Sequence, residues 1–552
     1  MDDDQGPRYA SNLLLREAYG GDPVLDGSVE SQRSGTQRRP DDKAKRTYLW
    51  SDGRDPQDLT LQRWGVIAPL GDEGDALLDA IKPLLQQRRR DQGDVDVRVD
   101  RLPPDMDAMA VLKWRREHFD RGDEFRLDLP RYQLILGDLH QISPEVQMIQ
   151  AASGAIGRLA FDTPDDYRRY VDKLLAWERA PRVQHDRRVV VHTVRDGTAS
   201  TGVADAELVR PGVELLRSRV GQGDLRGVRL VTSGSDEPAP VDLSQHATIY
   251  DPGVFFTVSH GEGAPRRGWR SPQLQRSRQG AMSFGTSGSI GAAEVGAGTW
   301  MPGALWMMFA CFSAGTPKTS KFARWLETLA GAGEFRGKVD EVLRSLPQGD
   351  ARPFVAALPK AALLNEHGPL GFVGHLDLAW TYSFRELRDG RSNARPARFM
   401  AVLRECLGGS RYGLAFREIY RYFDEVNTEL SVLEGADVQD PARRGHLWML
   451  RQDLAGYVLL GDPAARLPVR EPAAEPARST SVGDFFAFQV QVADTPKAAP
   501  IDLKTVEKAL ADYLRGESID AIARRLKVDK QALQAKIDRY QAAGREALKG
   551  DG

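Results

Sequence analysis

Two apolar runs, each ending at a potentially reactive side chain, constrain this sequence of 552 residues more than any other feature. The first run, residues 254–258, leads to His260 and Gly261, and the second, residues 305–309, leads to Cys311. Apolar runs without alternation are typical of strands that are buried on both faces of a parallel sheet. If the two strands are neighbours, His260 and Cys311 emerge at the sheet edge where open α/β sheets bind their ligands. The pair therefore predicts a cysteine nucleophile with a histidine base.

The composition is that of a globular protein with several domains. Hydrophobic residues make up 41% and charged residues 28% of the chain, as in ordinary folded proteins, and the length predicts about two to four domains. A formal net charge of −2 creates no long-range field that would favour nucleic acid or an acidic membrane. The two cysteines, Cys311 and Cys406, are too few for a disulfide framework or a cysteine zinc site, and such low usage fits a reducing compartment.

Neither a membrane segment nor a targeting segment is expected. No apolar run approaches the roughly 20 residues that span a bilayer, and the first residues lack the basic and apolar regions of a signal peptide. We therefore expect a cytoplasmic protein with no membrane partner. No cluster of metal-ligating residues stands out, so no metal and no cofactor are expected, although scattered carboxylates leave calcium binding open.

Composition and periodicity predict five segments. Residues 1–58 are polar and lack periodicity, which predicts a disordered leader. Strands alternate with helical stretches in 59–178 and again in 179–469, which predicts two α/β subdomains with mainly parallel strands. Residues 470–500 are rich in proline and predict a linker. Residues 501–552 predict a small all-α module of three helices.

Individual elements follow from local patterns. We expect helices over 76–87, 164–178, 205–219, from Ser320 through Leu326, and over much of 395–433, with Asp162 or Thr163 capping the second of them. Besides the two runs above, the expected strands cover 64–69, 95–99, 132–138, 188–194, 228–232 and 354–358. Residues 371–377 form a further apolar segment, and residues 457–463 close the second α/β unit.

The C-terminal module has a pattern of its own. Residues 522–529 have the apolar-turn-helix pattern of a helix-turn-helix. Lysine and arginine barely outnumber acidic residues in 501–552, whereas DNA-binding domains usually carry a clear basic footprint. A regulatory protein or DNA is therefore the expected partner of this module, with neither favoured.

The residues around Cys311 favour a reactive thiol over a buried one. The small residues 313–317 place the thiol at the end of an element, and a helix beginning there would lower the thiol pKa. His260 would take the thiol proton and return it to the leaving amine. The backbone N–H groups of Gly261 and Cys311 are expected to form an oxyanion hole.

Two further residues are alternatives to this pair. His375, in the segment 374–377, is a rival base, but no cysteine accompanies it in the same way. Cys406 lies in the helical pattern of 399–407 and is expected to be a buried structural residue.

The Ser-His-Gly and Ala-Cys-Phe-Ser-Ala-Gly motifs, about fifty residues apart, resemble those of the caspase-like cysteine peptidases of clan CD. Caspases carry Gln-Ala-Cys-Arg-Gly where residues 309–313 read Phe-Ala-Cys-Phe-Ser, so the chain looks closer to gingipain-type and CHAT proteases. Residues 132–138, 155–159 and 460–467 also look like gingipain-type signatures. The resemblance covers roughly residues 60–468.

This resemblance implies a caspase-like α/β/α sandwich, in which 59–178 would match the non-catalytic subdomain of gingipains. It also implies a cysteine-type endopeptidase that hydrolyses protein or peptide substrates through a thioester acyl-enzyme. Gingipains hold the basic side chain of their substrate with an acid, for which the candidates here are Asp196, Glu262, Glu294 and Asp377. Asp196 alternatively orients His260 as a third catalytic member, or is simply a turn residue beside Gly197.

A missing signal peptide favours an intracellular, regulated protease, in bacterial defence or cell death, over a secreted digestive one. Two other functions remain as alternatives. One is a catalytically inactive caspase-like scaffold, and the other is a DNA-linked regulator that acts through 501–552.

Overall fold

The computed structural model describes residues 55–119, 129–180, 187–469 and 503–537, except 224, 226, 266, 332–338, 389–390, 436–440, 515–516, 527, 529 and 531–532. These residues fall into two compact units, one up to residue 469 and one from residue 503. Nearly all of the expected leader (1–58) and the expected linker (470–500) lie outside the described residues.

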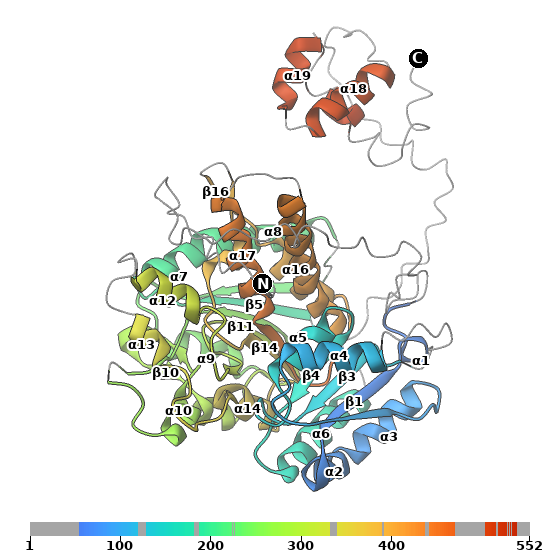
Figure 1. Ribbon diagram of the computed structural model, residues 1–552, viewed down its shortest axis with the longest axis vertical. Coiled ribbons are helices and arrows are strands. Elements are labelled where there is room, and N and C mark those ends of the chain that lie inside the picture. The colour runs from blue at the N-terminus through green and yellow to red at the C-terminus, as the bar shows by residue number, and fades with distance from the viewer. Residues whose placement is uncertain are drawn as a thin grey trace, which may run out of the picture. The chain divides into compact units, whose positions relative to one another are not determined.

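One ten-stranded sheet forms the centre of the first unit, and its strands follow the order β2-β1-β3-β4-β17-β14-β11-β7-β5-β6 (Figure 1). This sheet with its many helices confirms the predicted α/β class. Strands of 59–178 and of 179–469 share the sheet, and the division into two subdomains at that boundary stays a prediction. The ten strands are β1 (Trp64–Pro69), β2 (Arg98–Leu102), β3 (Tyr132–Leu136), β4 (Ala155–Leu159), β5 (Arg187–Thr193), β6 (Val228–Ser233), β7 (Gly253–Val258), β11 (Leu305–Phe309), β14 (Gly371–His375) and β17 (Tyr457–Leu460).

The strand directions decide where side chains gather. Among the described residues, every pairing within this sheet is parallel except that of β14 with β17. Strands β5, β7, β11 and β14 therefore end at one edge of the sheet. The strands on the other side of β14 run in the opposite direction and end at the other edge.

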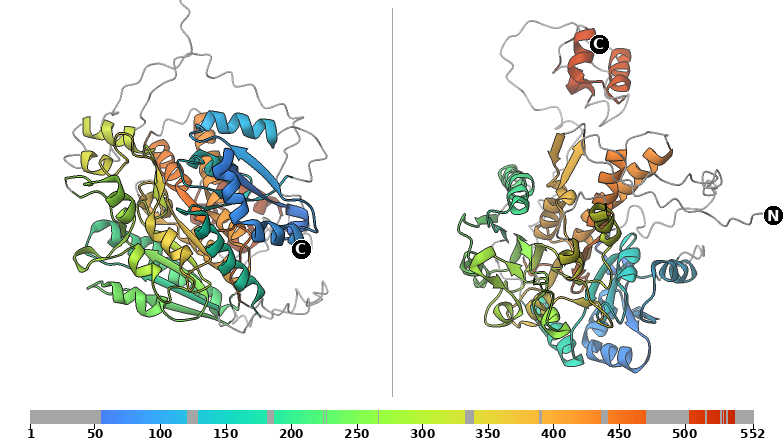
Figure 2. Two further views of the ribbon diagram at one scale, coloured as in Figure 1. Left: turned by 90° about the horizontal axis from the view of Figure 1, so that it is seen from below. Right: turned by 60° about the vertical axis from the view of Figure 1, so that its left-hand side comes forward.

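Helices cover both faces of this sheet (Figures 1 and 2). One layer comprises α2 (Gly71–Ala80), α3 (Lys82–Asp91), α6 (Pro164–Arg179), α10 (Pro272–Arg278), α11 (Ala292–Gly296) and α14 (Ala357–Leu364). The other comprises α4 (Ala108–His118), α5 (Pro144–Ala151), α8 (Arg210–Gly221), α15 (Ala397–Leu407), α16 (Tyr412–Gly435) and α17 (Pro441–Ala455).

Shorter elements complete the first unit. They are α1 (Leu59–Gln62), α7 (Ala199–Ala204), a π-helical turn (Asp205–Val209), α9 (Pro240–Ala247), α12 (Ala323–Gly331), α13 (Val339–Leu343), the 3-10 turns η2 (Gly285–Ser287) and η3 (Thr381–Phe384), and the strands β8 (His260–Gly261), β9 (Met282–Ser283), β10 (Ser289–Ile290), β12 (Gly315–Thr316), β13 (Phe354–Val355), β15 (Arg385–Arg388) and β16 (Arg391–Ala394).

Most expected elements are present, and the deviations have local causes. Thr163 caps α6 and forms a capping box with Asp166, as its pattern predicts. The single helix expected over 76–87 is wrong, because Pro83 lacks an N–H and starts a new helix, so that α2 ends and α3 begins around Ile81. The strand expected over 354–358 stops at Val355, where α14 follows.

A buried ion-pair network ties the first strand and helices to the end of the unit. The carboxylate of Asp462, which is fully buried, accepts hydrogen bonds from the Arg88 guanidinium at 2.7 and 2.9 Å and from the Trp64 indole at 3.0 Å. Glu178 and Asp91 also pair with Arg88. Burial disfavours the guanidinium charge, but these three carboxylates outweigh it and hold the pKa of Arg88 well above its usual value.

Loss of Asp462 should therefore destabilise the first unit. We expect Asp462→Ala to lower the free energy of unfolding by about 3 kcal/mol or more, because it removes one partner of a buried ion pair and leaves the other uncompensated. Urea denaturation followed by circular dichroism would measure this change. Asp165→Ala is the control, since Asp165 forms an exposed surface pair whose loss should change stability by less than about 1 kcal/mol.

The second unit contains α18 (Leu503–Leu514) and α19 (Ile519–Leu526), and residues 533–537 are also helical. Its small core consists of Val506, Ala509, Ile522, Ala523, Leu533 and Ile537. The helical nature of the described part agrees with the sequence, and its expected partner stays a prediction. Within the described ranges, the structure offers no helix with the length and apolar character that crossing a membrane requires.

Candidate active site

His260 and Cys311 come together because of the register of two buried strands. Val258, the last residue of β7, pairs with Phe309, the last residue of β11. The two strands are parallel, so the chain leaves both in the same direction. His260 lies as many residues after Val258 as Cys311 lies after Phe309. The sheet is further held in this region by the Trp306 indole, which donates a buried hydrogen bond of 2.9 Å to Thr257.

Two glycines, Gly261 and Gly280, pack directly against the backbone of Cys311 and Phe312, where a side chain would not fit. A Cβ atom on Gly261 would lie 1.9 Å from the Cys311 carbonyl oxygen, and one on Gly280 would lie 2.2 Å from the Phe312 carbonyl oxygen. Strand β8, which contains His260, pairs with β9 and is pressed against the backbone that carries the thiol. Glycine at position 261 thus has a steric reason, which is independent of the predicted role of its N–H in an oxyanion hole.

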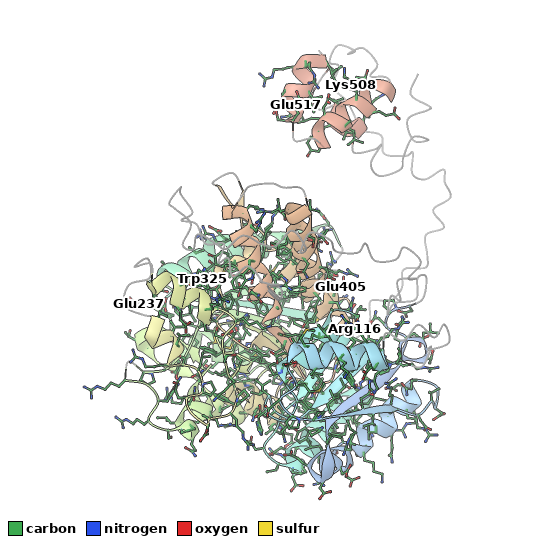
Figure 3. All side chains as sticks on the ribbon, in the orientation of Figure 1. Arg116, Glu237, Trp325, Glu405, Lys508 and Glu517 are labelled. Atoms are coloured by element: carbon green, nitrogen blue, oxygen red, sulfur yellow. The ribbon has the colours of Figure 1, made fainter. Side chains whose placement is uncertain are left out.

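Phe312, directly after the candidate nucleophile, has a left-handed backbone conformation with φ of 57°. Such a conformation is a genuine outlier for a bulky residue and concentrates at functional sites. The residue is held there because its N–H donates to the Asp377 carbonyl at 2.9 Å and its ring is buried in an aromatic cluster. Phe322, Trp325 and Trp380 belong to this cluster; Trp325 is labelled in Figure 3.

The close contact at Gly261 leads to a first site-directed prediction. We expect Gly261→Ala to destabilise the protein by about 1–3 kcal/mol, because the new methyl group overpacks a rigid backbone. Thermal unfolding would show a lower midpoint. Gly221→Ala, at a helical position with no atom within 4 Å of the new Cβ, should leave the midpoint unchanged or raise it, and an equal fall in both variants would contradict the steric explanation.

The imidazole of His260 is accessible and bound to hydroxyl groups. Its Nε2 atom lies 2.9 Å from the Thr198 Oγ1 and 3.3 Å from the Ser200 Oγ, and its side chain is 40% exposed. The Thr198 hydroxyl donates its own proton to the Asp196 carboxylate at 2.8 Å. Its oxygen therefore accepts from Nε2–H, and this network assigns the tautomer in which Nδ1 is the basic nitrogen.

Asp196 is the acid nearest to His260. Its Oδ2 lies 3.8 Å from Nε2, while its Oδ1 accepts hydrogen bonds from the backbone and side chain of Thr198 and from the side chain of Thr201. Burial favours the neutral carboxyl, but these bonds and the nearby His260 outweigh it and lower the pKa of Asp196. Asp196 is thus both a turn residue and a fixed negative charge behind the imidazole.

The Cys311 thiol is hydrogen-bonded to the backbone of Ala379 and not to His260. Its Sγ accepts the Ala379 N–H at 3.3 Å and donates to the Ala379 carbonyl at 3.5 Å. Burial raises the pKa of the thiol to about 11, although the Ala379 N–H acts in the opposite sense. The expected helix that would lower this pKa is absent, because β12 follows Cys311 and the next helix, α12, starts only at Ala323.

Three of the four candidate acids are bound to residues other than His260 and Cys311. Glu262 forms a bidentate ion pair with Arg278, and Glu294 caps the start of α11 at the Gly291 N–H. Asp377 is buried, and its carboxylate accepts from the Leu378 and Lys321 N–H groups and from a serine hydroxyl. Burial raises the pKa of Asp377 to about 6. Of the four candidates, Asp196 is the one placed beside His260.

The two alternatives to the dyad are fully buried. His375 accepts the Asp377 N–H at Nδ1 and donates from Nε2 to the Asp453 carbonyl, so neither nitrogen faces a thiol. Burial lowers the pKa of His375 to about 4. Cys406 lies inside α15, as expected, with no exposed surface.

Sequence reasoning missed the residues that hold the dyad in place. Thr198 and Ser200 contact His260, Ala379 contacts Cys311, and Asp453 of α17 anchors the segment around Ala379. These contacts connect positions about sixty or more residues apart. Threonine, serine, alanine and aspartate are common residues, so nothing in the neighbouring sequence indicates these contacts. Within the described ranges, no three His, Cys, Asp or Glu side chains converge as a metal site would require.

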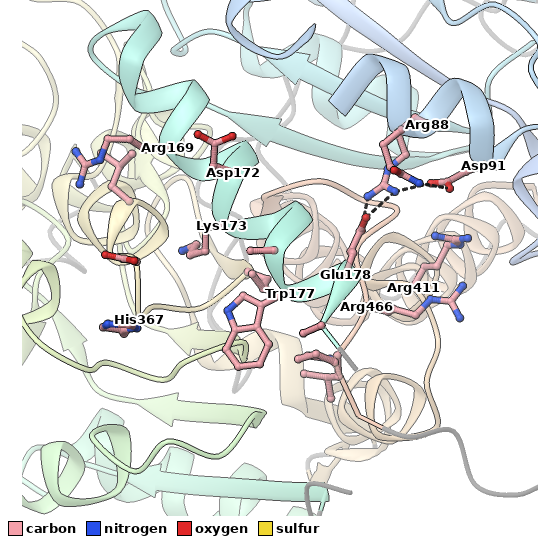
Figure 4. A pocket seen from close by; sticks show the side chains of 18 of the residues that line it. Arg88, Asp91, Arg169, Asp172, Lys173, Trp177, Glu178, His367, Arg411 and Arg466 are labelled. Atoms are coloured by element: carbon pink, nitrogen blue, oxygen red, sulfur yellow. Dashed lines mark hydrogen bonds and ion pairs between the residues drawn. The ribbon is translucent and has the colours of Figure 1, made fainter. Parts of the chain in front are cut away.

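A separate cavity of about 960 Å³ lies away from this site (Figure 4). It borders Tyr250 and Leu370, which precede β7 and β14, so it opens at the opposite edge of the sheet. Its carboxylates Glu178 and Asp91 are bound to Arg88, and Arg411 and Arg466 lie side by side at one end.

The sequence matches no known protein family and no curated protein. Solved structures with some likeness include the Arg-specific cysteine proteinase gingipain R (11% identity, 75% of this chain and 79% of that chain, TM-score 0.43) and the RgpB pro- and mature-domain complex of Porphyromonas gingivalis (13%, 74% and 80%, 0.41). A third is the separase–securin complex of Saccharomyces cerevisiae (11%, 60% and 15%, 0.26). At such identities and scores these likenesses decide neither a family nor an activity.

Proposed function

We propose that this chain is a cysteine endopeptidase in which Cys311 is the nucleophile and His260 the base. The observation that carries the proposal is the β7–β11 register, which sets an accessible imidazole and a thiol at equal depth on one sheet edge. Placing a nucleophile and its base on rigid neighbouring strands is the arrangement that covalent catalysis requires.

The reaction follows from the chemistry of the two groups. Once the thiol proton has moved to Nδ1 of His260, the Cys311 Sγ attacks the carbonyl carbon of the peptide bond, and backbone N–H groups of Gly261 and Cys311 stabilise the oxyanion. Collapse breaks the C–N bond, and His260 gives the proton to the leaving amine. Water, deprotonated by His260, then hydrolyses the thioester and frees the thiol.

Asp196 and Thr198 would position the base. The carboxylate accepts from the Thr198 hydroxyl, which in turn accepts from Nε2–H of His260. This chain of hydrogen bonds fixes the ring orientation and favours the imidazolium that forms during attack, as a third catalytic member does.

The proposal is tested by removing either group. We expect Cys311→Ala to abolish cleavage of a peptide library, and His260→Ala to reduce kcat/KM by about a thousandfold or more, because each group is needed for the same step. Mass spectrometry of the library products would measure both effects and reveal the preferred substrate residue. Cys406→Ala is the control with a thiol removed elsewhere, and full cleavage by Cys311→Ala would contradict the proposal.

The role of Asp196 can be separated from its role in the turn. Asp196→Asn keeps an oxygen that can accept from Thr198 and Thr201 but removes the negative charge, so we expect kcat/KM to fall by about tenfold to a hundredfold. Peptide turnover at constant pH would measure this fall. Glu294→Gln, which alters a carboxylate at the start of α11, should not change turnover, and an unchanged Asp196→Asn variant would exclude an electrostatic role.

A further inference from the structure

The segment that follows β14 contacts the half-buried candidate nucleophile through Ala379. Both backbone polar groups of Ala379 face the Cys311 thiol, because Sγ accepts from the Ala379 N–H and donates to the Ala379 carbonyl. The S–H···O=C bond can exist only with the protonated thiol. The contact therefore belongs to a form in which Cys311 is not a thiolate and its proton is not shared with His260.

Asp453 holds this segment from a different part of the chain. Its carboxylate is fully buried and accepts from the Trp380 N–H at 2.8 Å, from the Ser383 N–H at 3.1 Å and from the Ser383 hydroxyl at 2.6 Å. Three donors thus converge on one side chain of α17, one from just before the turn η3 and two from within it. The Asp453 backbone carbonyl also accepts from His375 at the end of β14.

Ring packing holds the other side of the same segment. Trp380 lies against Phe322 and Trp325, with ring centroids 5.6 and 5.3 Å apart. Asp377, just before the segment, binds the Lys321 N–H. Residues 378–383 are therefore clamped between α17 and the α12 region, with Ala379 at the point that meets the thiol.

We propose that residues 378–383 form a latch that keeps Cys311 as a resting thiol, and that Asp453 is the positioning residue that holds the latch closed. That the latch controls catalysis rests on the proposed function. That it lowers the reactivity of the Cys311 thiol does not. Cys311 is half-buried, and release of the segment would remove both bonds to Ala379, increase the exposure of Sγ to solvent and leave its proton to be taken by His260. A buried thiol that becomes solvated forms thiolate at lower pH and reacts faster.

The test measures the reactivity of Cys311 in the full-length chain and needs no peptide substrate. The rate of alkylation by iodoacetamide is followed by peptide mass spectrometry between pH 7 and pH 10, with buried Cys406 as an internal reference. In Asp453→Ala we expect Cys311 to react about tenfold or more faster at pH 7, because the thiolate fraction increases. We also expect its pH profile to move toward lower pH.

Two further variants keep the result interpretable. Ser383→Ala removes only the hydroxyl donor at 2.6 Å and should give a smaller acceleration in the same direction if Asp453→Ala does not fold. Asp462→Ala loses an equally buried aspartate in the Arg88 network and should leave the Cys311 rate within twofold of the unaltered protein. Alkylation is measured without denaturant, with folding checked by circular dichroism.

The possible outcomes separate the latch from the peptidase. A folded Asp453→Ala or Ser383→Ala variant with an unchanged Cys311 rate would overturn the latch, and so would an equal acceleration in Asp462→Ala. Faster alkylation of Cys311 in Asp453→Ala and Ser383→Ala, but not in Asp462→Ala, supports the latch. This holds even if the unaltered protein cleaves no more of the peptide library than Cys311→Ala does. Failure of the latch, conversely, leaves the library result unaffected.

Discussion

The pairing of β7 with β11 is the interaction on which the rest of this protein depends. Both strands are buried over their whole length, so a shift of register would move apolar side chains between the two faces of the sheet at a large cost. The register also fixes His260 relative to Cys311. Stability and the geometry of the candidate site therefore have the same physical origin, which is the burial of residues 254–258 and 305–309.

His260 and Cys311 differ in their surroundings. The imidazole of His260 stays partly exposed beside hydroxyl groups and a carboxylate, whereas burial raises the pKa of the half-buried Cys311 thiol. A thiol in this state is a poor nucleophile, since the thiolate is the reactive form. If the proposed peptidase function holds, movement of residues 378–383 has to precede attack by Cys311.

Local signals predicted the elements well and the supporting contacts poorly. The apolar run 64–69 and the Thr163 cap are visible in a few neighbouring residues, and both are present as predicted. The break at Pro83 is also visible locally, because proline lacks the N–H that the interior of a helix requires. The helices expected over 395–433 end before α17, so Asp453, which anchors the segment beside Cys311, is not among the predicted residues.

The sequence by itself determined the strands, their apolar runs and the two candidate catalytic residues that follow these runs, because such features depend on neighbours within a few positions. Only the tertiary structure decided that Asp196 lies behind His260, that Glu262 and Asp377 are bound by other groups, and that Ala379 covers the thiol. Those outcomes depend on loop paths between strands far apart in the chain. The free energy that selects such a path is spread over many weak contacts, and no single stretch of residues contains it.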